Sequence, residues 1–567
     1  QRWLTEAQWH EYYPDIESWA AVVSNCARWK CTKWQAGVLL YDIHEYSKRY
    51  CMMDTELCYR GYMCFREQMR TITGMDIDAF YTLPSVGFAY AIKEGVFDGV
   101  PQLAGVLREF VQDAVVGGRV CVRDNTPHEV SNEGIADFDA VGLYNSTMIM
   151  FPGFVTGKCR NLTPEELRSH ATIVSFNSCF VRVRVTGVRS TYGIPLTSYK
   201  DEEGRRIWSN DMVGRVTTME KTALEDAVNF GGMEYEALCG VCFPGPFNTA
   251  INKVSLHLFH ERLKMKAVKN PIQNTYKLVG NALYGRTLQK ASESVVKFVA
   301  VQQFDTTYYR NRYEYVQDFS YFYPPGQSAN DPGAEPYIVR VRERQPTCNH
   351  SNYAHAGCAV LGYSKRIMNE VMCLAEDLEP KCVHYTDTDS MHIPDRLLPA
   401  LAAKFEERYG RALVGKGYGQ FHTDFKWDGH KDIVSVHAVF CGKKAYVDQL
   451  AGRNTATGEW EVAAAPGDFH IRLKSVPTRA IEHYCGEHKL TPVELYQSML
   501  PSTDGVGLTE MEPTGEKVTF NCLAGGGCSF QSGRSDGLWR SKQLVRSVQF
   551  NRGGDIDPDG GYHIIAA

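Results

Sequence analysis

The sequence predicts a protein of the α+β class, with antiparallel strands and separate helical segments. Three observations support this prediction. At 567 residues, the chain is long enough for three or more domain-sized units. Long helical patterns, such as residues 354–378, occur apart from short apolar runs that are typical of strands, such as residues 135–141. At residues 383–393, apolar residues at alternate positions flank a polar turn, which predicts a β-hairpin.

The remaining elements follow along the chain. The first 70 residues are expected to be mainly helical, and Gly117–Gly118 breaks the pattern before a strand at 120–122. Short strands are expected between residues 173 and 217. A helix follows at 219–230, and residues 222–225 are expected to form its capped first turn.

Residues 250–290 are expected to be helical, with the helix ended or kinked at Pro271. Two Gly-rich or Pro-rich stretches, 324–333 and 525–527, predict exposed loops. The helix at 354–378 leads directly into the predicted hairpin.

The composition, with 44% hydrophobic and 22% charged residues, is that of an ordinary soluble globular protein. No uninterrupted apolar run reaches about 18 residues, so no membrane contact is expected. The first residue is Gln1 and no targeting sequence follows, so we expect a piece of a longer protein. We expect that protein to be intracellular, at a site in the cell that the sequence does not specify. The net charge of −5 excludes a protein that coats nucleic acid by bulk charge, but it allows a local basic channel.

The 18 cysteines are scattered, and most are expected to be reduced core thiols of an intracellular protein. Cys239 and Cys242 form a single C-x-x-C pair. Cys348 and His350 would complete a metal site only if the fold brought them close. The role of this pair stays open.

The run from residue 385 to 390 carries Asp387 and Asp389 among small hydroxyl residues, at the tip of the predicted hairpin. Carboxylate oxygens in such a position suit Mg²⁺, which borrows further ligands from a substrate's phosphates. An ordinary polar turn is the alternative for this run alone.

Asp139 lies at the exit of the predicted strand, with Gly142 allowing a tight turn and Tyr144 following as an aromatic plate. A helix cap is the alternative role for a single aspartate here. If Asp139 converges with the hairpin acids, the carboxylates could hold two metal ions for phosphoryl transfer.

On a helix, Lys277, Asn281, Tyr284 and Gly285 occupy positions i, i+4, i+7 and i+8 of one face. That face would suit a triphosphate with a flat base beside it. The surrounding residues 262–290 contain no acid, and their seven basic residues indicate an anionic partner rather than a solvated helix face. They are Arg262, Lys264, Lys266, Lys269, Lys277, Arg286 and Lys290.

Together, and in this order, these motifs resemble the polymerase core of family B DNA polymerases. The family's Asp-x-x-Ser-Leu-Tyr-Pro is similar to residues 139–145, with Gly142 and Asn145 as departures. Its Lys-x-x-x-Asn-Ser-x-Tyr-Gly is similar to residues 277–285, with Ala282 in place of Ser. Its Tyr-x-Asp-Thr-Asp-Ser is present in full at residues 385–390.

The resemblance implies a right-hand fold with an antiparallel-sheet palm, helical fingers and a small thumb. It implies that residues 1–115 are the C-terminal remnant of a 3′–5′ exonuclease domain. It assigns 116–160 and 351–470 to the palm, 251–290 to the fingers and 471–567 to the thumb. Residues 161–250 resemble a terminal-protein-contact insertion, and 291–350 a second, processivity-type insertion.

The resemblance also implies site roles. Asp139 and Asp389 are the expected ligands of two Mg²⁺ ions, which Mn²⁺ could replace, and Asp387 is the weaker third ligand. The metals would activate the priming hydroxyl and stabilise the phosphate in the transition state. Asp389 is expected to be indispensable.

For the incoming deoxynucleoside triphosphate, the resemblance implies binding by Lys277 and orientation by Asn281 beside Tyr284. Tyr144 is expected to stack under the sugar and exclude a 2′-hydroxyl. Lys266 is expected to assist, although the spacing does not choose between it and Lys264 or Lys269.

Lys444 and Tyr446 resemble the family's primer-gripping Lys-x-Tyr, and Arg472 and Lys474 belong to the basic strand that follows it. Tyr50 and Asp54 resemble the third exonuclease motif, Tyr-x-x-x-Asp. The acids that should precede that motif cannot be placed in the first 49 residues, so this piece is expected to lack proofreading.

The long segment between Asp139 and Lys277 resembles the insertion found at this place in protein-primed enzymes of adenoviruses, bacteriophages and Maverick-type elements. The implied partners are a DNA template-primer, deoxynucleoside triphosphates and a terminal protein, at a site of viral or mobile-element replication. The alternatives are an RNA-primed family B polymerase and a catalytically silent nucleic-acid-binding module. A reverse transcriptase fits less well, because that family carries adjacent aspartates.

Overall fold

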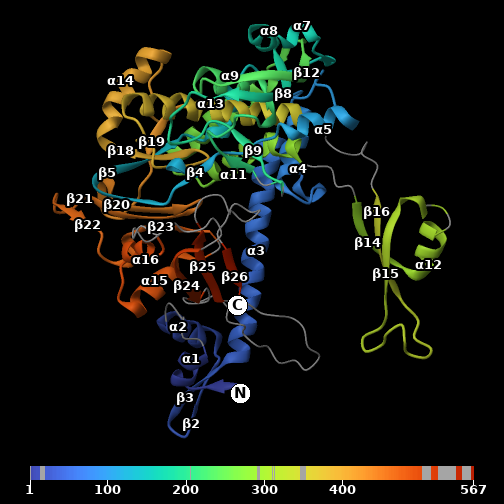
Figure 1. Ribbon diagram of the computed structural model, residues 1–567. Helices are drawn as coiled ribbons and strands as arrows, with labels where there is room; N and C mark the ends of the chain where they lie inside the picture. Colours follow the sequence, from blue (N-terminus) through green and yellow to red (C-terminus); the bar gives the residue numbers. More distant parts are fainter. Residues whose placement is uncertain are drawn as a thin grey trace.

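The computed structural model describes residues 2–12, 19–202, 204, 206–289, 294–309, 311, 313–344, 353–474, 476–500, 513–521, 545–551 and 563–566. It combines helices with sheets in which neighbouring strands run antiparallel, and this confirms the α+β prediction (Figure 1). No described helix is long and apolar enough to span a bilayer. Lys290, Cys348, His350 and residues 525–527 lie outside the described residues.

The largest sheet has nine strands and carries the predicted hairpin. Its order is β22-β21-β20-β5-β18-β17-β4, with β19 paired to β5 and β23 paired to β21. The bounds are β4 Val120–Val122, β5 His128–Ala140, β17 Tyr385–Asp387, β18 Ser390–Pro394, β19 Phe421–Thr423, β20 His430–Gly442, β21 Ala445–Asn454, β22 Trp460–Val462 and β23 His470–Leu473. The strand predicted at 135–141 is therefore the end of a longer strand, β5.

Helices cover this sheet on the side of α13 (Ala354–Leu378), whose bounds agree with the prediction. Apolar side chains of α13 pack in one core with β18 and with α14 (Leu398–Tyr409). Next to it lie α6 (Leu143–Met150), α10 (Ala250–Ala267), α11 (Ile272–Gly285) and α4 (Leu83–Lys93). Pro271 stands directly before α11 and separates it from α10, because proline cannot continue a helix from its N-terminal side.

A second, four-stranded sheet has the order β11-β8-β12-β7. Its strands are β7 Arg160–Asn161, β8 Ser178–Gly187, β11 Val216–Glu220 and β12 Glu234–Phe243, with α7 Pro164–Leu167, α8 His170–Ser175 and α9 Lys221–Asn229 against them. The prediction of a capped turn at 222–225 is wrong in its position, because the cap lies two residues earlier. Glu220 is the N-cap, and its carboxylate accepts hydrogen bonds from the backbone N–H of Thr222 and Ala223. Short pairs complete this region: β9 Ser198–Lys200 with β10 Arg206–Trp208, and β6 Phe154–Val155 with β13 Phe247–Asn248.

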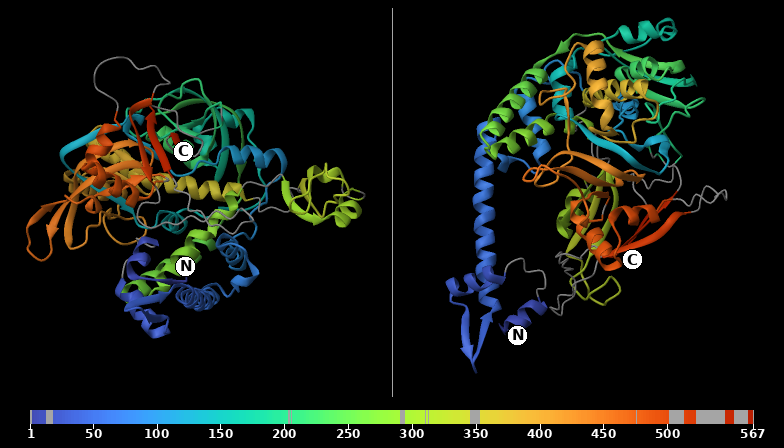
Figure 2. Two further views of the ribbon diagram at one scale, coloured as in Figure 1. Left: turned by 90° about the horizontal axis from the view of Figure 1, so that it is seen from below. Right: turned by 90° about the vertical axis from the view of Figure 1, so that its left-hand side faces the viewer.

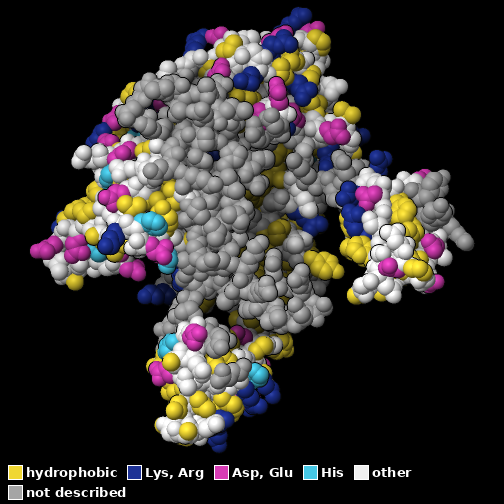
Figure 3. Space-filling view, turned by 60° about the horizontal axis from the view of Figure 1, so that its bottom comes forward, with side chains coloured by type: hydrophobic (Ala, Val, Ile, Leu, Met, Phe, Trp, Pro, Cys, Tyr) yellow, Lys and Arg dark blue, Asp and Glu magenta, His cyan; other side chains and the backbone are white. Residues whose placement is uncertain are grey.

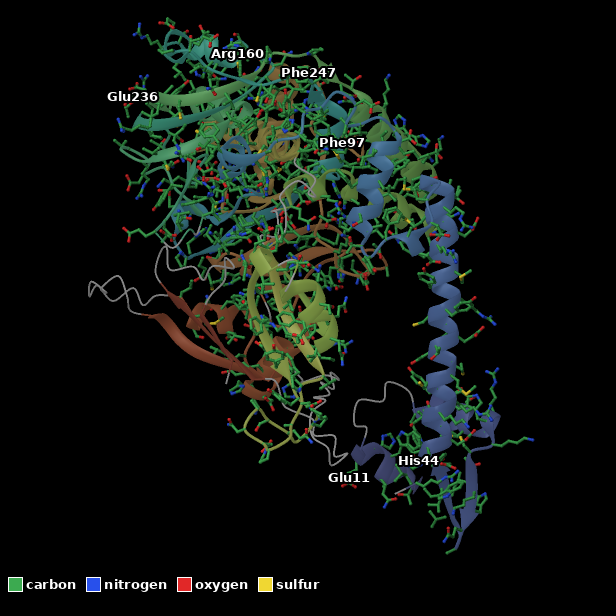
Figure 4. The ribbon with its side chains drawn as sticks, turned by 90° about the vertical axis from the view of Figure 1, so that its right-hand side faces the viewer. Glu11, His44, Phe97, Arg160, Glu236 and Phe247 are labelled. Carbon is green, nitrogen blue, oxygen red and sulfur yellow. The ribbon has the colours of Figure 1, made fainter. Side chains whose placement is uncertain are left out.

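The N-terminal residues form a small unit at the end of a long helix, α3 (Ile43–Thr73). It contains β1 Trp3–Leu4, α1 Glu6–Tyr12, α2 Trp19–Trp29, β2 Thr32–Gln35 and β3 Val38–Asp42, so the mainly helical prediction missed a three-stranded sheet. Figure 2 shows α3 as a single rod between this unit and the body, and Figure 4 labels His44 near one end of the rod and Phe97 in the body. The short helix α5 (Gly105–Asp113) follows in the body.

Two further units lie at the edges. Strands β14 Ser294–Ala300, β15 Val316–Phe322 and β16 Ile338–Arg344, with α12 Val301–Gln303, form a sheet that stands clear of the body (Figures 1 and 3). The loop predicted at 324–333 connects β15 to β16. After β23 come α15 Thr478–His488, α16 Pro492–Ser498 and a sheet of β24 Pro513–Asn521, β25 Val545–Asn551 and β26 His563–Ala566.

Candidate active site

The predicted hairpin is present, and its tip is held by backbone contacts. Asp387 pairs with Ser390, and between them Thr388 adopts a left-handed conformation with φ 63°. The N–H of Thr388 donates to the carbonyl of Arg119 at 2.7 Å, next to the end of β4. A Cβ on Gly118 would lie 2.6 Å from Thr388, so the glycine allows β4 to approach the turn. The turn therefore fixes where Asp389 can lie.

Asp139 is brought to the hairpin by the strand pairing of β5 with β18. Ser390 is the partner of Asp139, and the N–H of Ala140 donates to the carbonyl of Asp389 at 2.8 Å. Gly142, with φ 54°, then begins α6. The first and third sequence motifs are thus neighbours in the sheet, although about 250 residues separate them.

The carboxylates of Asp139 and Asp389 share a pocket of about 520 Å³. Burial, together with the charges of Asp389, Asp137 and Asp424, raises the pKa of Asp139 to about 8. Burial also raises the pKa of Asp389, while the positive charge of Lys277 lowers it. Crowded carboxylates of this kind fit divalent cations, which would stabilise their ionised forms.

The predicted helix face is on α11, and only part of it is open. Lys277 and Asn281 are exposed, and Lys277 is close enough to Asp389 for its positive charge to lower the pKa of that carboxyl. Tyr284 is buried, with its ring 5.1 Å from that of Tyr144. A Cβ on Gly280 would lie 3.3 Å from Asn145, so α11 packs closely on the start of α6. The first and second motifs therefore form one surface.

The predicted primer-gripping residues line the same pocket. The Nζ of Lys444 lies 2.9 and 2.7 Å from the two carboxylate oxygens of Asp387. Tyr446 and Arg472 face each other across β21 and β23, and both line the pocket. The N–H of Lys474 donates to the carbonyl of Lys444 at 3.0 Å. Because Lys444 neutralises Asp387, that acid is the one least free to hold a metal.

Three charged pocket residues were not singled out in the sequence: Asp137, Asp424 and Lys426. Asp137 precedes Asp139 by two positions, so the strand period of two could have found it. Asp424 forms an ion pair with Lys426 at 2.8 Å just after β19. No local pattern marks Asp424, because it reaches the site through the pairing of β19 with β5.

Other predicted residues lie elsewhere. Lys266 is exposed in the last turn of α10, and its neighbour Lys264 pairs with Glu261 at 2.6 Å. Tyr50 and Asp54 are exposed on α3. Cys239 is exposed and Cys242 is buried, both on β12, and neither joins a metal-binding cluster within the described part of the chain.

The comparison with protein families gives one match. The model for DNA polymerase type B, organellar and viral, matches residues 22–322, which is more than half of the chain. The matched segment includes Asp139 and Lys277 and ends before the acidic hairpin. A search of curated proteins found no match.

Several solved structures are similar at low sequence identity. A ternary complex of phi29 DNA polymerase with primer-template DNA and nucleotides is 14% identical, with a TM-score of 0.48, covering 79% of this chain and 66% of that one. An orthorhombic crystal form of the same polymerase gives 15% and 0.47, covering 70% and 61%. A family B polymerase from Pyrobaculum calidifontis gives 13% and 0.26, covering 71% and 36%. The chain spans about three fifths of the length of phi29 DNA polymerase as matched in its post-translocation binary complex with primer-template DNA.

Proposed function

Because the chain belongs to the organellar and viral type B DNA polymerases, we propose that it adds deoxynucleotides to a primer 3′-hydroxyl under the direction of a DNA template. One observation carries the proposal: Asp139 and Asp389 line a single pocket together with Lys444, Tyr446 and Arg472. Acids that suit metal ions face basic groups that suit a phosphate backbone.

In this proposal Asp139 and Asp389 hold two Mg²⁺ ions, which supply charge stabilisation for phosphoryl transfer. Lys277 and Asn281, exposed on α11 near Asp389, bind the triphosphate. Tyr144, held by Tyr284, limits the space at the sugar. A primer phosphate would compete with Asp387 for Lys444, so primer binding would release the Asp387 carboxylate.

Primer extension tests the proposal. Asp389→Asn keeps the shape of the side chain and removes its charge, so we expect a loss on the order of 1,000-fold in rate with Mg²⁺. Asp432→Asn is the matched control, since Asp432 is an exposed aspartate of β20 outside the pocket. No extension by the wild-type chain would favour a module that binds without catalysis, and equal rates for both variants would contradict the proposed role of Asp389.

We further propose that replication is protein-primed and serves a viral or mobile-element genome. The support is the four-stranded sheet inserted between the first and second motifs, from Arg160 to Phe243, which provides a separate surface for a terminal protein. The chain is incubated with the neighbouring gene's product and a radioactive deoxynucleotide, with no oligonucleotide primer present. We expect that product to become labelled. Extension of an RNA primer without any labelled protein would favour the RNA-primed alternative.

We propose the same domain assignment as the sequence implies: exonuclease remnant, palm, fingers, two insertions and thumb. The proposed thumb boundary at residue 471 falls inside β23. Beyond it, buried residues of α15 and α16 share a core with β20 and β21. The first part of the proposed thumb is therefore packed on the sheet of the palm.

A further inference from the structure

A cluster of ligand-type side chains that does not include Asp139 or Asp389 lies on strands β5, β18 and β23. Asp137, His392 and His470 each offer one ligand atom, and these atoms lie within 4.8 Å of one another. Asp137 and His392 are partners across β5 and β18, while His470 is the partner of Asp448 across β23 and β21. Two cross-strand pairs from different parts of the sheet thus meet.

Asp448 determines which ring nitrogen of His392 and of His470 carries the hydrogen. Its Oδ2 lies 3.3 Å from Nε2 of His392 and 3.2 Å from Nδ1 of His470. An ionised carboxylate only accepts hydrogen bonds, so each of these nitrogens must carry the hydrogen. In neutral rings, the lone pairs are then on Nδ1 of His392 and Nε2 of His470. Carboxylates orient metal-binding histidines in this way.

The cluster also contains buried polar atoms without partners. Among the described residues, Oδ1 of Asp137, Nδ1 of His392 and Oδ1 of Asp448 have no hydrogen-bond partner. The His392 side chain is completely buried, and its Nδ1 lies 3.9 Å from Oδ1 of Asp137, too far for a hydrogen bond. Unsatisfied buried polar atoms are costly, and a cation between them would satisfy two at once.

We propose that Asp137, His392 and His470 bind a divalent transition metal, with Zn²⁺ as the best-fitting ion. Two carboxylates and two neutral imidazoles balance one divalent charge. Tetrahedral zinc with bonds of about 2.0–2.1 Å places its ligand atoms about 3.3 Å apart. Asp137 and His392 therefore need to approach by about 0.6 Å, and the pairs with His470 by at most about 1.5 Å.

This site differs from the proposed catalytic site in its chemistry and its role. Imidazole nitrogens favour zinc, whereas the oxygen-only set of Asp139 and Asp389 favours Mg²⁺. Asp137 and His470 also line the 520 Å³ pocket, which gives the ion a way in. The metal would connect β5, which carries Asp139, and β18, which follows Asp389, to β23, which carries Arg472.

Zinc content tests the inference independently of polymerase activity. The full chain carrying Asp389→Asn, which weakens the catalytic site, is stripped with a chelator, given Zn²⁺ and dialysed before elemental analysis. We expect about one zinc per chain, and close to none when His470→Asn is added. The control is His430→Asn, which should keep the zinc, because His430 lies in the same sheet but bonds to Glu461.

Two further measurements guard against a folding defect. Zn²⁺ should raise the melting temperature of the stripped wild-type chain in a concentration-dependent manner. Asp448→Asn should weaken zinc binding about 10- to 100-fold, because it removes the orienting carboxylate. Unchanged zinc content in the His470 variant, or no shift in melting temperature, would overturn the inference and leave a protonated His392 between Asp137 and Asp448.

Discussion

Asp139 shares its pocket with Asp389, Asp137 and Asp424, and its pKa of about 8 lies well above the ordinary value of 3.8. A carboxyl with such a pKa favours folding in its protonated form and disfavours it once ionised. Its contribution to stability is therefore fully present below about pH 4 and is lost as the pH rises through about 8. Bound Mg²⁺ reverses the preference, since it requires the ionised form.

The resulting prediction concerns the protein without metal. With a chelator present, the melting temperature of the wild-type chain should fall more steeply between pH 5 and about 8 than that of Asp139→Asn. Mg²⁺ should remove most of this difference. Parallel curves for the two chains would contradict the electrostatic picture of the pocket.

Gly118 gives a second prediction at the scale of one residue. A methyl group in Gly118→Ala would meet Thr388 at 2.6 Å and push the turn that carries Asp389. A displacement of about 1 Å at a catalytic group costs on the order of 100-fold in rate, so primer extension should fall by that order.

Gly117→Ala is the control for this prediction, because its Cβ would meet nothing within 4 Å. Adding Thr388→Gly to Gly118→Ala should restore much of the rate, since it removes the clash and tolerates φ 63°. Equal activity of the two single alanine variants would argue against control of the hairpin by Gly118.

At the scale of elements, the sequence predicted α13, β4 and the hairpin well, because each has a strong local pattern. In the N-terminal 70 residues it predicted the helical majority, which α1, α2 and α3 confirm, but it missed the strands between them. Residues 32–42 form two strands that are stabilised by their pairing and by a core around Trp9 and Tyr41, and these contacts are not visible in a local pattern.

The contact between α4 and α11 yields a prediction for an element. A Cβ on Gly87 would lie 2.5 Å from the Cβ of Ala282, one residue after Asn281. Gly87→Ala should force the helices apart, lower the free energy of unfolding by about 1–3 kcal/mol and raise the KM for deoxynucleotides.

The control for Gly87→Ala is Gly61→Ala, another glycine within a helix. Gly61 lies on exposed α3 with open space around its Cβ position. Alanine there should increase stability by about 0.5–1 kcal/mol. Thermal unfolding and nucleotide titrations of both variants check the pair, and an unchanged KM in Gly87→Ala would separate α11 from nucleotide binding.

At the scale of the whole molecule, the sheet of β14, β15 and β16 has its own core of Val299, Phe304, Val339 and Val341. Its Lys and Arg side chains lie on the edge nearest the body (Figure 3). Leu288, before this unit, packs against the position of Gly357, after it. The two points at which the chain leaves and re-enters the body on either side of this unit are therefore close.

Replacing residues 291–350 by a Gly/Ser linker of about eight residues should leave the body folded, since such a linker spans about 15 Å. We expect similar extension of a primer by a few nucleotides and much shorter products per binding event on a long template. A trap assay with excess competitor DNA measures this. Unchanged product length would contradict a processivity role for the unit.

The sequence by itself determined the class of the protein and predicted its reactive groups, because motif identity and spacing are local properties of the chain. Asp139, Lys277 and Asp389 could be named from it, and the structure brings all three to one place. Only the tertiary structure decided that Lys444 neutralises Asp387 and that Asp137 meets His392 and His470. Those meetings depend on the register of antiparallel strands far apart in sequence, which no local pattern specifies.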